Sequence, residues 1–193
     1  MTGRRHAGEG AARGPGDARA RVAVEPSAAR LAGLAPVVRA DARLLVLGSF
    51  PGVASLAAAQ YYAHPRNQFW PIMSRLTGQP LADLPYPERL GGLLVAGVAL
   101  WDVVESCVRP GSLDSAIRGA LGNAFDPVLA TAPRIGAVAF NGGTAARAAG
   151  WFESRGLAVY RMPSTSPAHA ALTLAAKLER WSTLARDGWI RSR

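Results

Sequence analysis

The sequence predicts an α/β fold, a three-layer α/β/α sandwich around a central, mainly parallel four-stranded sheet. Four short apolar runs, at 44–48, 95–100, 135–140 and 157–161, have the length and residue types of buried strands. Segments with a helical spacing of apolar residues separate these runs. Strands that alternate with helices form parallel sheets that are covered on both faces.

The first half of the chain opens with a segment of different composition. Residues 1–28 are rich in Arg, Ala and Gly without periodicity, which predicts a disordered tail ahead of one domain at 29–193. The strand at 44–48 is followed by a helix from Ser55 to about residue 60 and a second from Asn67 to Thr77, which Gly78 ends. A proline-rich connector at 80–87 leads to a short helix over 88–94.

The second half repeats the alternation. The strand at 95–100 runs into Trp101-Asp102, and helical spacing predicts helices over 113–121 and 125–132. The strand at 135–140 ends in a turn at 141–144, which a helix follows to about Ser154. After the strand at 157–161, a loop covers 163–167 and an amphipathic helix over 170–186 completes the domain.

The charge balance is basic. The chain of 193 residues carries 22 Lys and Arg against 13 Asp and Glu, a formal net charge of +9. A basic protein of this size is often a nucleic-acid binder, because neutralising phosphates dominates such binding. An arginine-rich coding bias explains the same composition, so charge alone leaves both explanations open.

Cofactor-binding residues are sparse. Cys107 is the single cysteine, and the histidines at 6, 64 and 169 lie far apart, so we expect neither a disulfide nor a metal or organic cofactor. No apolar run reaches the roughly 20 residues of a membrane helix, and the start of the chain lacks the apolar centre of a secretory signal. We therefore expect a cytoplasmic monomer without membrane contact.

Four segments of the sequence indicate the function. Gly-Ser-Phe-Pro-Gly at 48–52 follows the first strand, at the sheet edge where α/β folds bind ligands. The segment 60–70 brings two tyrosines, a histidine and an Asn-x-Phe-Trp, and the segments 100–106 and 161–169 follow further strands. Together they resemble the motifs of the uracil-DNA glycosylase superfamily, in the branch similar to DNA-deoxyinosine (hypoxanthine) glycosylases, over about residues 31–185.

This resemblance implies a monofunctional DNA glycosylase of base excision repair. Its partner would be DNA containing deaminated bases, hypoxanthine first and uracil or xanthine in addition. A mismatch-type uracil/thymine glycosylase is the alternative among enzymes. A non-catalytic binder of damaged DNA is the alternative outside them, because Phe50 and Met162 stand where the family usually has an Asp or Asn and a His.

The resemblance assigns catalysis to Asn67. In the similar branch an Asn at this position takes over from the missing water-positioning residue. An amide carbonyl can accept a hydrogen bond from the attacking water and hold it near C1′ of the sugar. The structural alternative is that Asn67 caps the helix that begins there.

The base pocket would comprise Phe50, Tyr62 and Asp102. Tyr62 would stack on the extruded base, whereas Tyr61 would belong to the core. A carboxylate at Asp102 accepts hydrogen bonds only, which suits the N1–H of hypoxanthine and repels the N1 lone pair of adenine. Because charge on Asp102 would oppose a base that leaves as an anion, we expect it to be displaced or paired with Arg109; a capping or surface role is the alternative.

The DNA contacts would come from small residues and hydroxyls near the crevice. The resemblance and the composition of the loops point to Gly52, Ser164, Ser166 and His169 as contacts to the DNA backbone. A solvated or capping role is the alternative for His169. Lys177, the single lysine, belongs to the final helix and is expected to lie away from the crevice.

Overall fold

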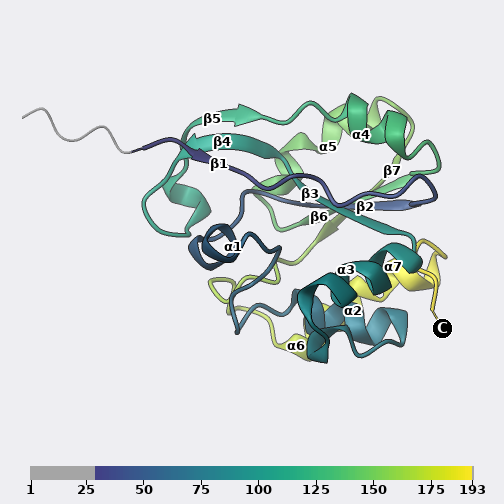
Figure 1. The fold of residues 1–193 in the computed structure, drawn as a ribbon. Coiled ribbons are helices and arrows are strands. Elements are labelled where there is room, and N and C mark those ends of the chain that lie inside the picture. Colours follow the sequence, from purple (N-terminus) through teal and green to yellow (C-terminus); the bar gives the residue numbers. More distant parts are fainter. Residues whose placement is uncertain (1–28, 193) are drawn as a thin grey trace, which may run out of the picture.

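The computed structural model describes residues 29–192, so the predicted tail at 1–28 and Arg193 lie outside it. The main sheet contains β2 (Leu44–Gly48), β3 (Val98–Asp102), β6 (Ala137–Asn141) and β7 (Ala158–Met162). Its order is β3-β2-β6-β7 and every pair is parallel (Figure 1). The predicted four-stranded sheet is confirmed. The second strand begins three residues later than expected, after Gly97 makes a left-handed turn with φ of 83°.

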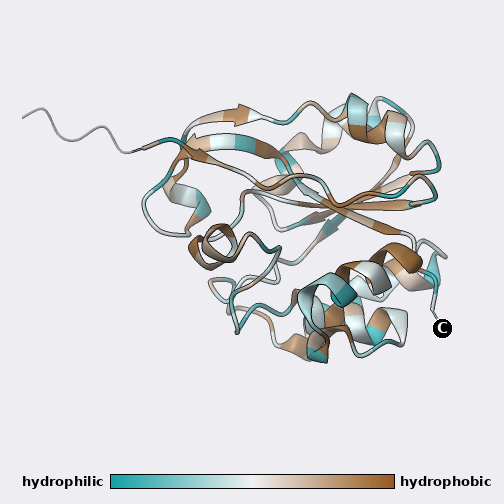
Figure 2. Ribbon diagram, in the orientation of Figure 1, coloured by the Kyte–Doolittle hydropathy of each residue, from teal (hydrophilic) through white to brown (hydrophobic). Residues whose placement is uncertain are grey.

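Helices cover both faces of this sheet and complete the three layers. One face packs against α2 (Phe69–Thr77), α3 (Tyr86–Val95), α6 (Leu174–Trp181) and α7 (Thr183–Arg186); the other packs against α4 (Asp126–Thr131) and α5 (Ala149–Glu153). Alternate residues of β2 point to opposite faces of the sheet and pack against the two helical layers. Leu44 and Val46 belong to the first core, whereas Leu45 and Leu47 belong to the second. β2, β3 and β6 are buried along their whole length and mainly apolar, as strands covered on both faces are (Figure 2).

A second, antiparallel sheet was not expected. It contains β1 (Leu31–Ala32), β4 (Val104–Val108) and β5 (Arg118–Gly122) in the order β1-β4-β5. The helix predicted over 113–121 is therefore wrong, because only a 3-10 turn, η2 (Asp114–Ala116), precedes β5. Gly111 and Gly119 have φ of 69° and 54°, which interrupts a helix, and pairing with β4 holds the exposed β5 in place.

The remaining helices are shorter than their patterns suggest. The helix α1 (Val53–Ala58) begins two residues before Ser55, and η1 (Leu81–Asp83) fills the proline-rich connector. The helix expected up to Ser154 is split into η3 (Ala145–Ala148) and α5. The final helix begins at 174 because Thr173 Oγ1 caps it by accepting from Ala176 N at 3.2 Å. No helix within residues 29–192 has the length and apolarity needed to cross a bilayer.

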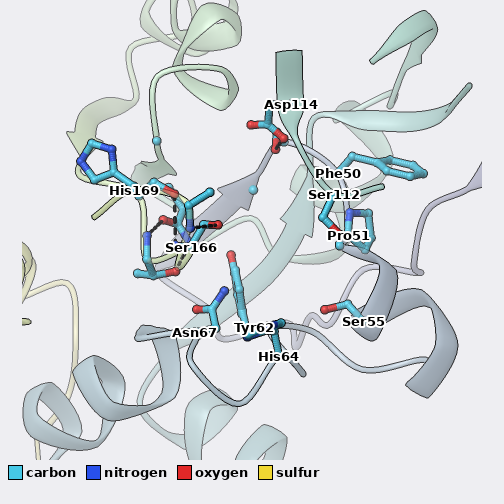
Figure 3. Close-up of a pocket in the computed structure, with 18 of the residues that line it drawn as sticks. Phe50, Pro51, Ser55, Tyr62, His64, Asn67, Ser112, Asp114, Ser166 and His169 are labelled. Atoms are coloured by element: carbon cyan, nitrogen blue, oxygen red, sulfur yellow. Dashed lines mark hydrogen bonds between the residues drawn. The ribbon is translucent and has the colours of Figure 1, made fainter. Parts of the chain in front are cut away.

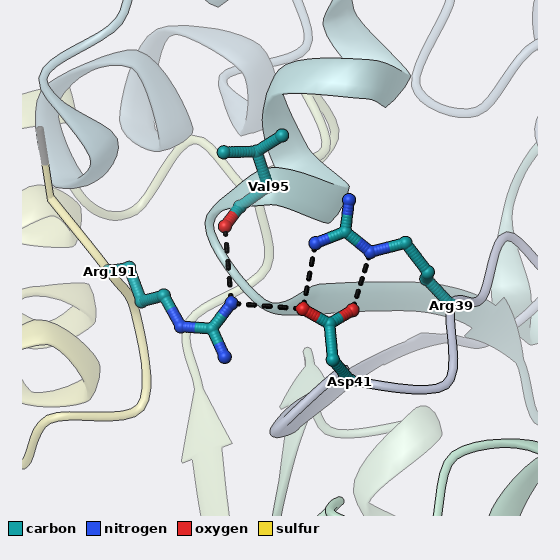
Figure 4. Close-up of polar contacts among 4 residues, drawn as sticks. All are labelled: Arg39, Asp41, Val95 and Arg191. Carbon is teal, nitrogen blue, oxygen red and sulfur yellow. Dashed lines mark hydrogen bonds and ion pairs between the residues drawn. The ribbon is translucent and has the colours of Figure 1, made fainter.

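The C-terminal segment is tied back to the start of the domain. Asp41 accepts from Arg39 through both carboxylate oxygens and from Arg191 Nη1 at 3.1 Å (Figure 4). These hydrogen bonds, from Arg39 first and then Arg191, hold the pKa of Asp41 below its usual range. The backbone N of Arg191 also donates to Ala96 O at 3.0 Å, so the segment after α7 is fixed against the end of α3.

Candidate active site

A cleft of about 340 Å³ lies at the carboxyl ends of β2, β3 and β6. Its walls come from segments 48–55, 61–67, 112–114, 141–144 and 164–169, together with Asp102 (Figure 3). Parallel strands place their carboxyl ends at one edge of a sheet, so segments distant in sequence meet there. The cleft brings together every residue that the sequence singled out: Phe50, Gly52, Tyr62, Asn67, Asp102, Ser164, Ser166 and His169.

Asp102 lies at the bottom of the cleft beside Gly48. The two residues are partners at the ends of β3 and β2, and a Cβ at position 48 would overlap Asp102 Oδ1, so only glycine fits. Asp102 is 4% exposed, and its Oδ2 has no hydrogen-bond partner within residues 29–192. Burial first, and then the negative charge of Asp114, raise the pKa of Asp102 to about 7. The positive charge of Arg109 acts in the opposite direction and lowers this pKa.

Arg109 does not pair with Asp102 in the described part of the chain, so the second of the two alternatives suggested for Asp102 is wrong. Its guanidinium donates to the carbonyls of Gly111 and Pro51 and lies 4.9 Å from the ring centre of Phe50. It thereby braces the loop after β2. The ring of Phe50 is 5% exposed and packs with Val104 and Cys107, pointing away from the cleft in Figure 3. Only the backbone at Phe50 is therefore available to a ligand in the cleft.

Tyr62 points into the cleft from the opposite wall (Figure 3). Its ring stacks on Phe69, with centroids 3.9 Å apart, and its buried Oη has no partner among the described residues. Burial raises the pKa of Tyr62, so the hydroxyl is neutral. Its φ of 57° is unusual for a residue with a side chain, and such strain is found most often at functional sites. Tyr61 belongs to the core, as predicted, and donates to Ala35 O at 3.0 Å.

Asn67 lies beside Tyr62 at the entrance to α2. Its Oδ1 accepts from Phe69 N at 3.0 Å, and its backbone N donates to His64 O at 2.8 Å. Gln68 is the N-cap of α2 and makes no side-chain cap hydrogen bond, so Asn67 is not the cap of this helix; its amide lies one residue ahead and accepts from the first helical N–H. A carbonyl oxygen has two lone pairs, and this hydrogen bond uses one of them. The hydrogen bond fixes the direction of the amide in the cleft.

The loop at 163–169 is fixed to the end of β6. Asn141 Nδ2 donates to Thr165 Oγ1 and Thr165 N donates to Asn141 Oδ1, both at 2.8 Å. Gly142 has φ of 103°, and a Cβ there would come within 3.0 Å of Ser164 Cβ. These contacts hold Ser164 and Ser166 at the cleft, whereas Met162 is turned into the core.

Lys177 lies outside the cleft, as expected, but directly beneath this loop. It is 1% exposed, and its Nζ donates to His169 O at 2.8 Å. Burial lowers the pKa of Lys177. It lines a second hollow of about 280 Å³ that shares Ser166, Pro167 and His169 with the cleft.

Sequence reasoning missed two polar residues of the cleft. Asn141 follows a strand in the same way as Asp102 does, so its position could have identified it. Asp114 could not be identified from the sequence, because it belongs to the segment 113–121, for which a helix was predicted. Its Oδ1 accepts from Ser49 Oγ at 2.7 Å. Among residues 29–192 no cluster of His, Cys, Asp or Glu could hold a metal ion.

Comparison with known proteins identifies the family to which the chain belongs. The family model for the uracil DNA glycosylase superfamily matches residues 35–185. A hypoxanthine DNA glycosylase of Methanosarcina barkeri (strain Fusaro / DSM 804) is 36% identical over 110 residues, 57% of this chain and 70% of that protein. A hypoxanthine DNA glycosylase of Methanosarcina acetivorans is 31% identical over 137 residues, 71% of this chain and 87% of that protein.

A solved structure shows the same fold. The solution NMR structure of a candidate uracil DNA glycosylase from Methanosarcina acetivorans superimposes with a TM-score of 0.75 at 28% identity. The match covers 82% of this chain and 98% of the other.

Proposed function

Because the chain belongs to the uracil DNA glycosylase superfamily, we propose that this DNA glycosylase removes deaminated bases from DNA, hypoxanthine first, in base excision repair. One observation carries the choice of substrate. The cleft ends in two buried polar atoms without partners in the described chain, Asp102 Oδ2 and Tyr62 Oη, beside an apolar stack. Buried polar groups without partners indicate where a ligand binds.

The base enters this cleft after leaving the DNA stack. Flipping costs a few kcal/mol, and stacking on an aromatic ring returns roughly 1–3 kcal/mol per base. Tyr62 supplies that ring, and its packing on Phe69 keeps it in place. Ser164, Ser166, His169 and the backbone at Gly52 line the entrance and contact the sugar and phosphates on either side.

Asn67 positions the water for hydrolysis. The glycosidic bond breaks through a sugar with oxocarbenium character, so a held water is needed more than a strong base. The second lone pair of Asn67 Oδ1 accepts a hydrogen bond from that water, while the hydrogen bond to Phe69 N fixes the amide.

Asp102 reads the edge of the base. Hypoxanthine, uracil and xanthine each present an N–H beside a carbonyl oxygen, and the free Asp102 Oδ2 can accept from that N–H. Adenine presents a lone pair at the equivalent nitrogen. The edge does not separate hypoxanthine from uracil, so the walls around Tyr62 decide between them.

A cleavage assay tests this function. Duplexes with one deoxyinosine, one deoxyuridine or neither are incubated with the protein and then treated with alkali. We expect strand breaks at inosine only after alkali, and no adduct with borohydride, because a monofunctional enzyme forms no Schiff base. Faster cleavage at uracil opposite guanine indicates the mismatch-type alternative. Binding without any cleavage indicates a non-catalytic damage binder.

A further inference from the structure

Two carboxyl groups face the cleft, and the buried one has no cation as partner. Asp102 is 4% exposed and makes no salt bridge with any residue of the 29–192 range. The Asp114 carboxylate lies on the rim above it, on the wall opposite Tyr62 in Figure 3. An ionised carboxylate without a counter-charge is costly at such a depth, so this environment selects the neutral form of Asp102.

Asp114 is held in place by the loop that follows β2. Ser49 Oγ donates to Asp114 Oδ1 at 2.7 Å, and Val53 N donates to Ser112 Oγ at 2.9 Å. Ser49 is next to Gly48, whose missing side chain leaves room for Asp102. The two carboxyl groups are therefore fixed relative to each other through one short loop.

We propose that Asp102 enters the reaction as a neutral carboxylic acid, kept so by its burial and by the negative charge of Asp114, and donates a hydrogen bond to the departing base. The inference rests on the proposed function and adds to it a role for Asp114. Asp114 acts through Asp102 and is a positioning residue. The effect of burial and of Asp114 on the pKa of Asp102, which reaches about 7, agrees with this geometry.

The chemistry of bond breaking explains the advantage. When the N-glycosidic bond breaks, its electron pair leaves with the base, and the water oxygen forms the new bond to C1′. The water loses one proton as this bond forms, and the base anion gains one, so the products are the free base and the 1′-hydroxyl of the abasic sugar. A carboxylate next to the base would oppose that charge, whereas a neutral carboxyl stabilises it without transferring its proton. The neutral group also offers a donor beside an acceptor, which matches the carbonyl oxygen and N–H of hypoxanthine or uracil. Only the ionised form repels the N1 lone pair of adenine, so the neutral form leaves the exclusion of adenine to the walls around Tyr62. Buried carboxyl groups kept neutral are an established catalytic device.

The pH dependence that Asp102 causes must be distinguished from that of the other titratable groups around it. Arg109 opposes the effect of Asp114, and the raised pKa values of Tyr61 and Tyr62 keep both hydroxyls neutral. His64 and His169 also line the cleft, so the test controls for both of them.

The test is the pH dependence of single-turnover excision from an inosine duplex. For the wild type, the rate should fall about tenfold per pH unit above a midpoint near 7, as one proton is lost. Asp114→Asn should move that midpoint to lower pH, whereas the matched control Asp114→Glu keeps the charge and should leave it in place. Asp102→Asn retains a donor that does not titrate, so its rate should be flat in this range and exceed the wild-type rate at pH 9.

The histidines provide the remaining control. His64→Gln and His169→Gln should leave the midpoint where it is, whatever they do to the rate. A midpoint that moves with either histidine, or that is the same in Asp114→Asn and wild type, overturns the inference and leaves the proposed function standing. Absence of inosine excision at every pH overturns both.

Discussion

Asn67 combines a structural contact with a proposed catalytic role in one amide. Its hydrogen bond from Phe69 N orients the group that the proposed reaction needs. The sequence suggested catalysis or helix capping; the structure assigns the N-cap of α2 to Gln68 instead, and catalysis by Asn67 stays a prediction. By contrast, no local pattern around Phe50 or Arg109 could show that their side chains pack together under the loop, because that contact joins distant segments.

Replacement of Asn67 separates its two roles. Asn67→Ala should lower single-turnover excision about 100-fold or more, because the water is no longer held. It should also cost about 1 kcal/mol of folding stability through the lost hydrogen bond from Phe69 N, with little change in affinity for an inosine duplex. Asn67→Ser keeps an oxygen that can accept from Phe69 N but does not reach the water, so it should recover stability without activity. Excision at the wild-type rate by Asn67→Ala contradicts the assignment.

Asp102 should also make stability depend on pH. Its pKa in the folded protein, about 7, exceeds the ordinary value of 3.8, so its contribution is fully present below pH 3.8 and is lost as pH rises through 7. Relative to its value below pH 3.8, the stability should be lower by about 2 kcal/mol at pH 5, where Asp102 must take up a proton on folding, and by about 4 kcal/mol at pH 8.5, where the buried group is ionised. Asp102→Asn should therefore stabilise the protein more at pH 8.5 in urea unfolding. Equal gains at the two pH values would show that the carboxyl is ionised throughout.

At the scale of elements, the main sheet could be read from the sequence and the second sheet could not. The runs that became β2, β6 and β7 are apolar on both faces, which is a local signal. β5 consists of Arg, Gly, Ala, Leu and Gly with every side chain exposed, and it forms only by pairing with β4. The predicted ends of the strands were enough to locate most of the site. Asp114 was missed, because its position depends on the non-local pairing of β5 with β4.

A buried pair of side chains, Asn141 and Thr165, holds the middle of the loop at 163–169. Thr165→Val removes the hydroxyl that accepts from Asn141 Nδ2 and leaves that amide buried without a partner. We expect a loss of about 1–3 kcal/mol in unfolding free energy and weaker binding of DNA, because Ser164 and Ser166 are no longer held. Thr165→Ser retains the hydroxyl and is the matched control. If Thr165→Val binds a duplex as tightly as Thr165→Ser does, the pair does not organise the DNA contacts.

At the scale of the whole molecule, the three-layer body and the small sheet have different tasks. The body supplies the strand ends that carry Gly48, Asp102 and Asn141. The small sheet carries the segment 109–114 over the rim and fastens it to the loop after β2 through Arg109, Ser112 and Asp114. Parallel strands build the floor of the cleft, and an antiparallel hairpin completes its wall.

The buried position of Lys177 allows its chemical modification to report when the loop at 163–169 opens. Because this one amine side chain is covered by residues 163–169, an acylating reagent can modify it only when the loop lifts from α6. The sole thiol, Cys107, is 0% exposed in a different core and reports the opening of the small sheet instead. Mass spectrometry with both reagents should show the lysine reacting earlier than the thiol, and bound DNA should delay the lysine alone. Simultaneous modification would mean that the loop opens only when the whole protein unfolds.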